Sequence, residues 1–168
     1  MAVFFYEGLP GRYGLEETDG ALTHLWLEGK EKAGSGRNAA AWMPDTVNGE
    51  LLETPLFRET KAQLDAYFAG RLKAFSLPLA PAGTEFQKKI WKLLQDIPYG
   101  TTRTYGEIAA LAGDPKACRA VGMANNRNPM PILIPCHRVV GANGSLVGYG
   151  GGLDIKLRLL QLEGIWLL

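Results

Sequence analysis

Residues 132–140 read Ile-Leu-Ile-Pro-Cys-His-Arg-Val-Val, an apolar run that brings one cysteine and one histidine side by side. A proline has no N–H with which to continue a β-ladder, so Pro135 is expected to end a strand. A strand that ends there would bring Cys136 to the edge of a hydrophobic core. The sequence therefore predicts that the rest of the chain supports Cys136 in a position where a reactive side chain is useful.

The composition is that of a soluble globular protein, with 46% hydrophobic and 21% charged residues in a chain of 168. A chain of this length forms one domain, or one domain with a smaller partner, and buries roughly two-thirds of the surface that its unfolded form exposes. Neither a disulfide nor a metal is needed to stabilise such a core, and we expect no cofactor.

Two cysteines, Cys118 and Cys136, and two histidines, His24 and His137, are present. Their spacing makes neither a Cys-x-x-Cys pair nor a set of metal ligands, so we expect no metal site. This cysteine content favours a reducing compartment. The first residues lack a basic leader and no apolar run approaches the ~18 residues of a membrane span, so we expect an intracellular protein that does not bind membranes.

The net charge of +1 is unevenly distributed when the chain is divided at Gly83. Residues 1–83 carry 8 Lys and Arg against 11 Asp and Glu, whereas residues 84–168 carry 10 against 6, so the two parts have net charges of −3 and +4. The second part is the candidate for an anionic partner, although a scatter of solvated surface charge explains the same numbers equally well. Motifs have to decide between these interpretations.

The first part, residues 1–83, is predicted to be a small α/β domain with a short antiparallel sheet. Asp19-Gly20 is a strong two-residue turn between extended segments and predicts a hairpin. Pro55 marks the start of an amphipathic helix that Gly70 stops. The predicted elements are strands at 3–6, 13–17 and 21–27, a loop at 28–49, this helix, an edge strand at 74–79 and a proline-bounded linker at 78–83.

The second part, residues 84–168, is predicted to be a mainly helical domain, which makes the fold class α/β overall. Capping boxes open the first two helices, and Gly113 stands where a left-handed residue ends the second. The second and third helices form a helix-turn-helix pattern. The predicted helices run from 84 to 97, from 104 to 111, from an Asp114 cap with Pro115 at the first position to about Asn125, and from 154 to 163.

The third helix carries a surface suited to DNA. Small side chains let a backbone approach a nucleic acid closely, and cations meet phosphates. Equally, small residues can pack a helix onto a core, and helix pairs of this kind are common. The cations are Lys116, Arg119 and Arg127, and the small residues include Ala117, Ala120 and Gly122.

A nucleophilic cysteine needs a base or a cation nearby, because a thiol with a pKa of about 8.5 is only a few per cent thiolate at neutral pH. His137 is adjacent to Cys136 in sequence. Adjacent residues on a strand point to opposite faces, so a hydrogen bond between them requires a turn or a bridging water. A carboxylate would then orient the imidazole. The candidates stay open: Glu85, Asp96, Glu107, Asp114, Asp154 and Glu163.

Residues 135–139, Pro-Cys-His-Arg-Val, have further motifs around them: Asn-Pro at 128–129, Gly-Tyr at 148–149 and Gly-Gly-Leu at 151–153. Together these resemble the signature of the O6-alkylguanine-DNA alkyltransferases, also called methylated-DNA–protein-cysteine methyltransferases. The resemblance extends over about residues 84–164 and is weak in the first half of the chain.

The resemblance implies DNA repair by an irreversible, single-turnover transfer of the alkyl group from O6-alkylguanine to Cys136. His137 would deprotonate this cysteine through a bridging water, and Glu163 would orient His137. Asn128 resembles the hinge residue that ties the recognition helix to the active-site turn. No route from the resulting thioether back to a thiol is evident, so each molecule would act once.

The resemblance also implies how DNA is bound. Guanine O6 is unreachable inside a stacked duplex, so the nucleotide must be rotated out at a cost on the order of a few kcal/mol. Tyr105 resembles the tyrosine that helps this rotation, and Arg119 resembles the arginine that enters the duplex in its place. The helix would lie in the minor groove, unlike that of most helix-turn-helix proteins. The implied guanine pocket comprises Tyr105, Pro131, Val139, Tyr149, Gly151 and Lys156.

The expected partner is double-stranded DNA that contains O6-alkylguanine, bound by a monomer in the cytoplasm, or in the nucleus of a eukaryote. Three alternatives are a non-catalytic alkyltransferase-like protein that binds lesions, a helix-turn-helix regulator, and a hydrolase that uses Cys136 and His137. The lesion-binding proteins replace the cysteine, so Cys136 argues against the first. Cys118 is either a second thiol near DNA or, as free cysteines more often are, a small buried hydrophobe.

Overall fold

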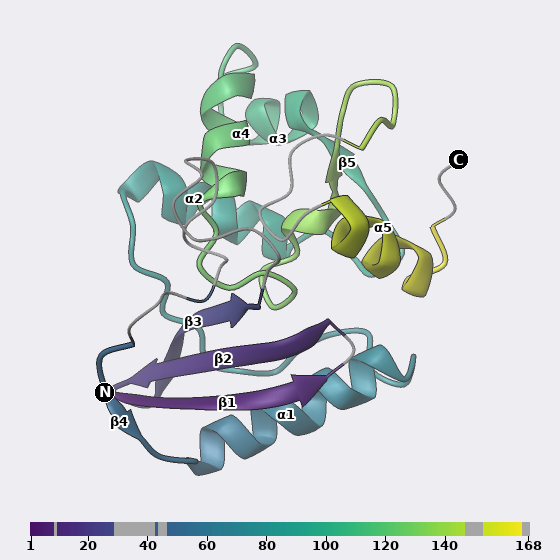
Figure 1. Cartoon of the computed structure of the whole chain (residues 1–168). Helices are drawn as coiled ribbons and strands as arrows, with labels where there is room; N and C mark the ends of the chain where they lie inside the picture. Colours follow the sequence, from purple (N-terminus) through teal and green to yellow (C-terminus); the bar gives the residue numbers. More distant parts are fainter. Residues whose placement is uncertain (9, 29–42, 44–46, 147–152, 166–168) are drawn as a thin grey trace.

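A computed structural model describes the whole chain except residues 9, 29–42, 44–46, 147–152 and 166–168. The predicted α/β fold is confirmed: a small sheet with one long helix across it forms the first part, and a group of helices forms the second (Figure 1). The strands of the sheet are β1 (Ala2–Gly8), β2 (Gly11–Thr18), β3 (Ala21–Leu27) and β4 (Glu50–Leu51), in the order β3-β2-β1-β4.

The predicted hairpin is confirmed. β2 and β3 pair antiparallel across a two-residue turn, in which Asp19 and Gly20 have φ angles of 52° and 80°. Glycine adopts this left-handed region freely, and aspartate tolerates it better than most residues. β1 pairs antiparallel with β2, while the short β4, which the sequence pattern did not predict, pairs parallel with β1.

The helix α1 (Pro55–Phe68) is the predicted amphipathic helix, and it packs against β1. The Thr54 hydroxyl caps it by accepting a hydrogen bond from the N–H of Phe57 at 3.1 Å. Gly70, with a φ of 76°, follows its end as predicted. Phe57 and Tyr67 are at most 1% exposed, so α1 brings a tyrosine into the interior of the protein.

The helices of the second part are α2 (Glu85–Gln95), α3 (Tyr105–Leu111), α4 (Cys118–Asn126) and α5 (Leu153–Leu162). The capping box that opens α2 is confirmed, because the Thr84 hydroxyl accepts from the N–H of Gln87 at 3.1 Å and the Gln87 side chain accepts from the N–H of Thr84 at 2.9 Å. Within the described part of the chain, no helix is long and apolar enough to cross a membrane.

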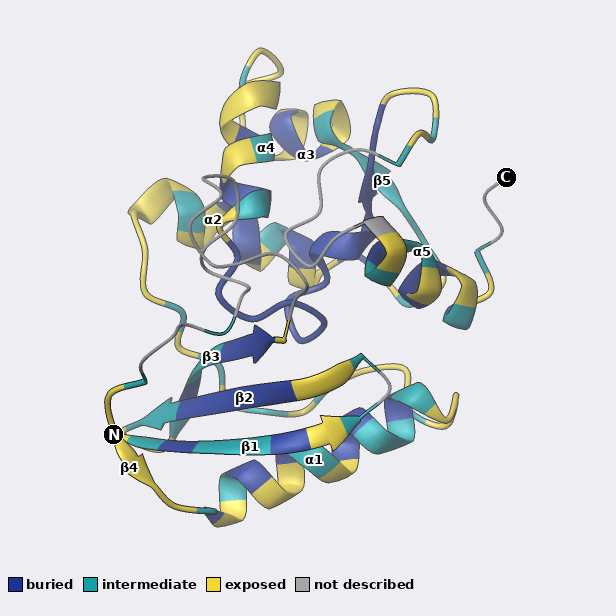
Figure 2. Ribbon diagram, viewed as in Figure 1, coloured by how far each residue is buried: buried dark blue, intermediate teal, exposed yellow. Residues whose placement is uncertain are grey.

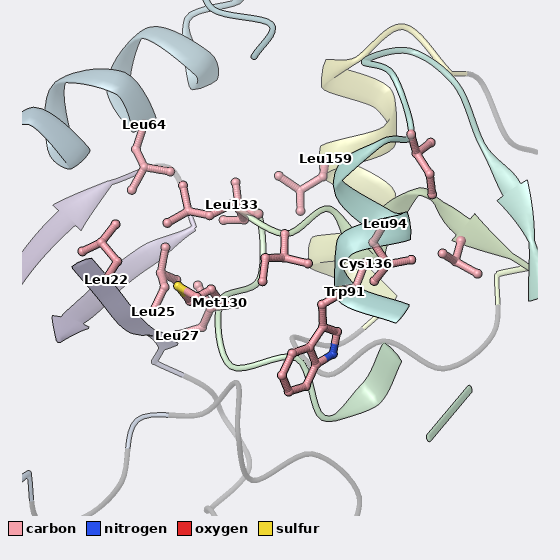
Figure 3. Close-up of a cluster of buried hydrophobic side chains, with 14 of the residues drawn as sticks. Leu22, Leu25, Leu27, Leu64, Trp91, Leu94, Met130, Leu133, Cys136 and Leu159 are labelled. Carbon is pink, nitrogen blue, oxygen red and sulfur yellow. The ribbon is translucent and has the colours of Figure 1, made fainter. Parts of the chain in front are cut away.

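One hydrophobic core extends through both parts of the chain, as the buried segments in Figure 2 and the close-up in Figure 3 show. Trp91 of α2 lies in it, and its indole N–H donates to the Ala124 carbonyl of α4 at 2.8 Å. The N–H of Leu25 in β3 donates to the Pro129 carbonyl at 2.9 Å. The sheet therefore packs directly on the segment that leads to Cys136. The core includes Leu22, Leu25, Leu27, Leu64, Met130, Leu133 and Leu159.

The predicted strand before Cys136 is wrong, because this segment is a turn. A bridge joins Pro131 to Ile134, and Ile132 has a φ of 75°, which a β-branched residue rarely adopts. Pro131 and Pro135 cannot donate to a ladder, so the apolar run cannot extend as a strand. The strand in this region follows the cysteine: β6 (Val139–Val140) pairs parallel with β5 (Arg103–Thr104).

The third predicted helix begins later than expected, at Cys118 rather than after Asp114. The carboxylate of Asp114 accepts from the N–H of Lys116 at 3.0 Å and closes a separate turn around Pro115. Short carboxylates that bond a backbone N–H two residues on compete with helix formation in this way. The left-handed residue that ends α3 is confirmed, since Gly113 has a φ of 95°.

The predicted edge strand at 74–79 does not form. This stretch contributes an isolated bridge between Leu79 and Leu22, with the N–H of Leu22 donating to the Pro78 carbonyl at 2.9 Å. Pro78 has no N–H for a longer ladder. The segment therefore crosses the edge of β3 in extended form before the chain enters α2.

Candidate active site

A turn of 3-10 helix, η1 (Cys136–Arg138), carries the cysteine and the histidine. The N–H of Cys136 donates to the Ile134 carbonyl at 2.7 Å, and the N–H of Arg138 donates to the Pro135 carbonyl at 3.0 Å. Neighbouring side chains on such a helix are about a third of a turn apart, not on opposite faces. Cys136 is 3% exposed and His137 is fully buried, so the reactive pair sits on a tight turn inside the protein.

Two asparagines hold this turn, Asn125 from α4 and Asn128 from the segment that follows α4. The Asn128 side chain donates to the Ile134 carbonyl at 2.8 Å and accepts from the N–H of Met130 at 2.9 Å. The Asn125 side chain, from α4, donates to the Cys136 carbonyl at 3.4 Å. A displacement of α4 is therefore transmitted by hydrogen bonds to the residue that carries the thiol.

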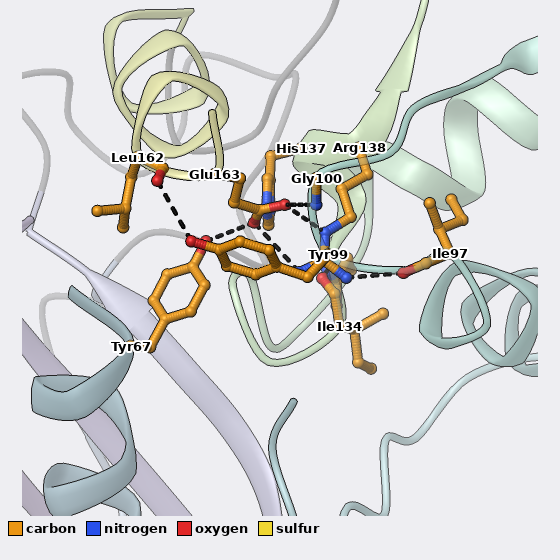
Figure 4. Close-up of polar contacts among 10 residues, drawn as sticks. Tyr67, Ile97, Tyr99, Gly100, Ile134, His137, Arg138, Leu162 and Glu163 are labelled. Carbon is orange, nitrogen blue, oxygen red and sulfur yellow. Dashed lines mark hydrogen bonds and ion pairs between the residues drawn. The ribbon is translucent and has the colours of Figure 1, made fainter. Parts of the chain in front are cut away.

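Glu163 directly follows α5 and accepts five hydrogen bonds in the interior (Figure 4). Its Oε1 accepts from Arg138 Nε at 2.8 Å and from the N–H of Gly100 at 3.1 Å. Its Oε2 accepts from His137 Nε2 at 2.6 Å, from a second guanidinium nitrogen of Arg138 at 3.1 Å and from the Tyr67 hydroxyl at 2.6 Å. Burial raises the pKa of this carboxyl, but the hydrogen bonds from His137, Arg138 and Tyr67 outweigh it and lower the pKa to about 2.

The tautomer of His137 follows from the charge of Glu163. An ionised carboxylate only accepts hydrogen bonds, so Nε2 carries the proton and Nδ1 presents a lone pair. Among the described residues, Nδ1 has no hydrogen-bond partner. Burial lowers the pKa of His137, and the charge of Glu163 opposes this shift only in part. His137 is therefore a neutral imidazole with a free basic nitrogen next to Cys136.

Two further predicted residues lie near the thiol. Lys156 of α5 is fully buried, and its ammonium donates to the Val139 carbonyl at 2.6 Å. Burial lowers the pKa of Lys156 to about 8, while the charge of Cys136 acts in the opposite direction. Tyr105, the first residue of α3, is half-buried, and burial together with Cys136 raises its pKa to about 12. Tyr105 therefore stays protonated and can donate a hydrogen bond at neutral pH.

The remaining predicted pocket residues divide into two groups. Pro131, before η1, is buried, and Val139, which begins β6 directly after η1, is fully buried. Tyr149 and Gly151 lie outside the described residues. Of the predicted guanine pocket, the described residues therefore include only those contributed by α3, α5 and the segment around η1.

The residues of the predicted DNA surface lie on α4, on the turn before it and, for Arg127, directly after it. Gly122 has open space where a Cβ would stand, which does not fit a role in packing on the core. Ala117 is half-buried and does pack partly against the core. The exposed residues of this surface are Lys116, Arg119, Ala120 and Arg127. The core-packing interpretation of the small residues therefore applies to Ala117 and not to Ala120 or Gly122.

Cys118, the first residue of α4, is exposed, so the interpretation as a buried hydrophobe is wrong. Its thiol donates to the carbonyl of Pro115, in the exposed turn before the helix, at 3.8 Å. In the part of the chain that the structure describes, no three His, Cys, Asp or Glu side chains gather in a way that could hold a metal ion.

Comparison with known proteins identifies the family. The model of the 6-O-methylguanine DNA methyltransferase DNA-binding domain matches residues 85–165, and that of the ribonuclease-like domain matches residues 22–81. A constitutive methylated-DNA–protein-cysteine methyltransferase of Bacillus subtilis is 47% identical over 92% of this chain and 90% of its own length. A Methanosarcina acetivorans methylated-DNA–protein-cysteine methyltransferase is 68% identical over 64% of this chain and 69% of its own.

The chain belongs to this family. A solved structure of Mycobacterium tuberculosis OGT in complex with DNA matches it with a TM-score of 0.80 and 41% identity, covering 97% of this chain and 92% of the other. The recognition made from residues 135–139 and their flanks is confirmed, as is the predicted class of activity, DNA repair by alkyl transfer to a cysteine.

Four residues that contact Cys136 or Glu163 were not predicted from the sequence: Tyr67, Gly100, Asn125 and Arg138. Arg138 lies inside the quoted motif, and a requirement for a cation beside a buried carboxylate could have indicated it. Asn125 lies on the predicted recognition helix, but its contact with the Cys136 carbonyl has no sequence signal. Tyr67 and Gly100 are 96 and 63 positions from Glu163 along the chain, so only the folded structure brings them to the carboxylate.

Acid should destabilise this methyltransferase through Glu163 and His137. The unfolded Glu163 binds a proton below its ordinary pKa of 4.5, whereas the folded carboxyl stays ionised down to about pH 2. The stability that this group contributes above pH 4.5 is therefore lost towards pH 2, on the order of 3 kcal/mol in total. The pKa of folded His137 is lowered from 6.5, so the unfolded chain binds a proton at this residue before the folded protein does. This lowers the stability of the fold further as the pH falls below 6.5.

Urea unfolding at a series of pH values from 7 to 3 measures this effect. We expect the unfolding midpoint to fall steadily with pH in the wild-type protein. A Glu163→Gln variant should start lower and lose less between pH 4.5 and 3, because it has no carboxyl to protonate. If the unfolding midpoints of the two proteins fell by the same amount with pH, the acid sensitivity would not come from Glu163.

Proposed function

We propose that this protein repairs double-stranded DNA by moving the alkyl group of an O6-alkylguanine onto its own Cys136, once per molecule. The observation that carries the proposal is a buried turn that holds both Cys136 and His137, in which Nδ1 of the histidine is free and Nε2 is fixed by the ionised Glu163 carboxylate. Residues 84–168 would form the DNA-binding and acceptor domain, and residues 1–83 a separate α/β domain packed against it.

The chemical step follows from this arrangement. Nδ1 of His137 takes the proton of the Cys136 thiol, through a bridging water as the family resemblance implies, and Glu163 stabilises the imidazolium that forms. The thiolate attacks the alkyl carbon in line with its bond to O6. A sulfur–carbon bond forms as the carbon–oxygen bond breaks, and the bonding electrons stay on guanine.

Guanine leaves after it has taken up one proton, which balances the proton removed from the thiol. The Tyr105 hydroxyl, protonated at neutral pH, is suited to donate towards the guanine as negative charge develops there. Lys156 fixes the Val139 carbonyl beside the pocket. Asn128 would hold the turn in register with α4.

The same proposal assigns the DNA contact to the surface of α4 and the turn before it. The exposed cations Lys116, Arg119 and Arg127 would meet phosphates or enter the duplex. Ala120 and Gly122 would let the helix backbone approach the minor groove closely, with Ala117 at the start of the helix. Binding should weaken as salt is raised, because phosphate contacts release counterions. The related Mycobacterium tuberculosis protein, solved in complex with DNA, supports DNA as the partner.

The test is a stoichiometric transfer assay. Protein is incubated with an excess of duplex that carries one O6-methylguanine labelled in its methyl group, and label on the protein is followed with time. One methyl group per protein, with a plateau that added duplex does not raise, supports the proposal. Tight binding without transfer would indicate a lesion-binding protein, and continued turnover would exclude a thioether end point.

Arg119→Ala should separate DNA extrusion from chemistry. We expect the rate constant for repair of a duplex to fall about 10-fold or more, because an inserted side chain offsets part of the cost of rotating a nucleotide out of the stack. Reaction with free O6-benzylguanine, which needs no extrusion, should change little. Lys116→Ala is the matched control for loss of one exposed cation, and equal losses on both substrates would contradict the role of Arg119.

We further propose that the protein acts as a monomer in the cytoplasm, the compartment of DNA in the bacteria and archaea whose proteins it resembles. The alkyl-acceptor turn is completed within one chain, which supports a monomer. Sedimentation of the free protein at micromolar concentration tests this directly.

A further inference from the structure

Tyr67 connects the N-terminal part of the chain to the Glu163 carboxylate. It lies on α1, is 1% exposed, and its hydroxyl donates to Glu163 Oε2 at 2.6 Å. The same oxygen accepts from His137 Nε2, also at 2.6 Å. Figure 4 shows the two donors reaching the carboxylate from different sides, one from α1 and one from the active-site turn. A side chain from residues 1–83 is thus linked to the proposed general base, His137, through one residue, Glu163.

The surroundings keep this hydroxyl in place. The Tyr67 ring packs edge-on against Tyr99, with ring centroids 6.1 Å apart, and is tilted against Phe75, with centroids 5.3 Å apart. Burial, followed by the charge of Glu163, raises the pKa of Tyr67, so it remains a neutral donor wherever the protein is folded. A carboxylate has about four lone-pair directions, and the five donors to Glu163 leave it little freedom to rotate.

We propose that Tyr67 is a positioning residue of the alkyl-transfer site, whose hydroxyl holds the Glu163 carboxylate in line with His137. The N-terminal part of the chain then completes the site, beyond packing against it. The inference rests on the proposed function. A second hydrogen bond also connects the N-terminal part to the active-site segment: the N–H of Leu25 in β3 donates to the Pro129 carbonyl, just before the active-site turn.

Tyr67→Phe removes this hydroxyl and keeps the ring. We expect the single-turnover rate constant for methyl transfer to fall about 10-fold, because the carboxylate is held less firmly. Loss of one donor also leaves more negative charge on Oε2 for His137, which stabilises the imidazolium. The acid limb of the pH–rate profile should therefore move to higher pH by about half to one unit. A loss of packing alone would not move that limb.

Tyr13→Phe is the matched control. Tyr13 is 1% exposed in β2 of the same core, and among the described residues its hydroxyl has no hydrogen-bond partner. This variant should keep the wild-type rate constant and pH profile. The folded fraction of each variant is measured under the assay conditions and used to correct its rate constant, so a less stable variant can still be compared.

A double-mutant cycle with Glu163→Gln decides whether Tyr67 acts through the carboxylate. We expect Tyr67→Phe to have no further effect on the rate constant or the acid limb in the Glu163→Gln background. The inference is overturned if Tyr67→Phe matches the wild type, or if it has the same effect in both backgrounds. Absence of transfer by the wild-type protein would instead overturn the proposed function, so the two failures can be told apart.

Discussion

Cys136→Ala should abolish methyl transfer while it leaves the affinity for DNA within about twofold of wild type. The thiolate is the strongest nucleophile on the buried turn, and alanine fills nearly the same space. The cations proposed to meet DNA, Lys116, Arg119 and Arg127, are exposed, whereas Cys136 is buried. Transfer is measured by label on the protein, and affinity by titration of a duplex at fixed salt.

Cys118→Ala is the matched control, because it removes the second thiol at an exposed position. It should retain full transfer. If Cys118→Ala lost transfer and Cys136→Ala retained it, the acceptor would be on the recognition helix. A complete loss of DNA binding in Cys136→Ala would show that the turn contributes to the DNA interface, contrary to the separation proposed above.

Glu163→Gln should lower the rate constant for transfer by roughly 10²- to 10⁴-fold, the range associated with a positioned general base. An amide cannot stabilise an imidazolium, and its N–H₂ can donate to Nε2 of His137, which would place the proton on Nδ1 and remove the basic lone pair. Arg138 would also lose the carboxylate that accepts two of its hydrogen bonds.

The fall should be the same on a duplex and on free O6-benzylguanine, because the deprotonation of Cys136 is common to both reactions. This distinguishes Glu163→Gln from Arg119→Ala. A Glu163→Gln protein that reacts with free O6-benzylguanine at the wild-type rate would exclude a role of the carboxylate in the chemical step.

Local sequence signals predicted the elements whose ends are fixed by single residues. Thr84 and Gln87 close a capping box, Asp19 and Gly20 form the hairpin turn, and Gly70 follows the end of α1. In each case the decisive interaction spans a few positions, so the pattern contains all the information that the local structure needs.

The predicted secondary structure was wrong where two interactions compete for the same segment. Ile132 has strong β propensity, but Pro131, Pro135 and the Asn128 side chain hold the segment as a turn with φ of 75° at the isoleucine. Asp114 has the features of a helix cap, but its carboxylate binds the N–H of Lys116 and the helix starts later. Neither competition can be decided from residue types alone.

The candidate site also contains residues that the sequence pattern identifies and residues that only the fold brings together. Cys136 and His137 could be found from the motif, whereas the choice of Glu163 among six carboxylates came from the family resemblance. The hydrogen bonds that lower the pKa of Glu163 to about 2 come from Tyr67, Arg138 and His137. Only the fold brings these residues together, since α1 and the end of α5 are far apart along the chain.

The central claim, that Cys136 is the alkyl acceptor, is tested most directly by peptide mass. The protein is reacted with a duplex that contains O6-methylguanine and digested with trypsin, which places the two cysteines in different peptides, residues 117–119 and 128–138. The expected result is one added methyl group on the Cys136 peptide in an amount equal to the protein, with the Cys118 peptide unmodified. A methyl group on the Cys118 peptide, or none on either peptide despite loss of O6-methylguanine from the DNA, would contradict the claim.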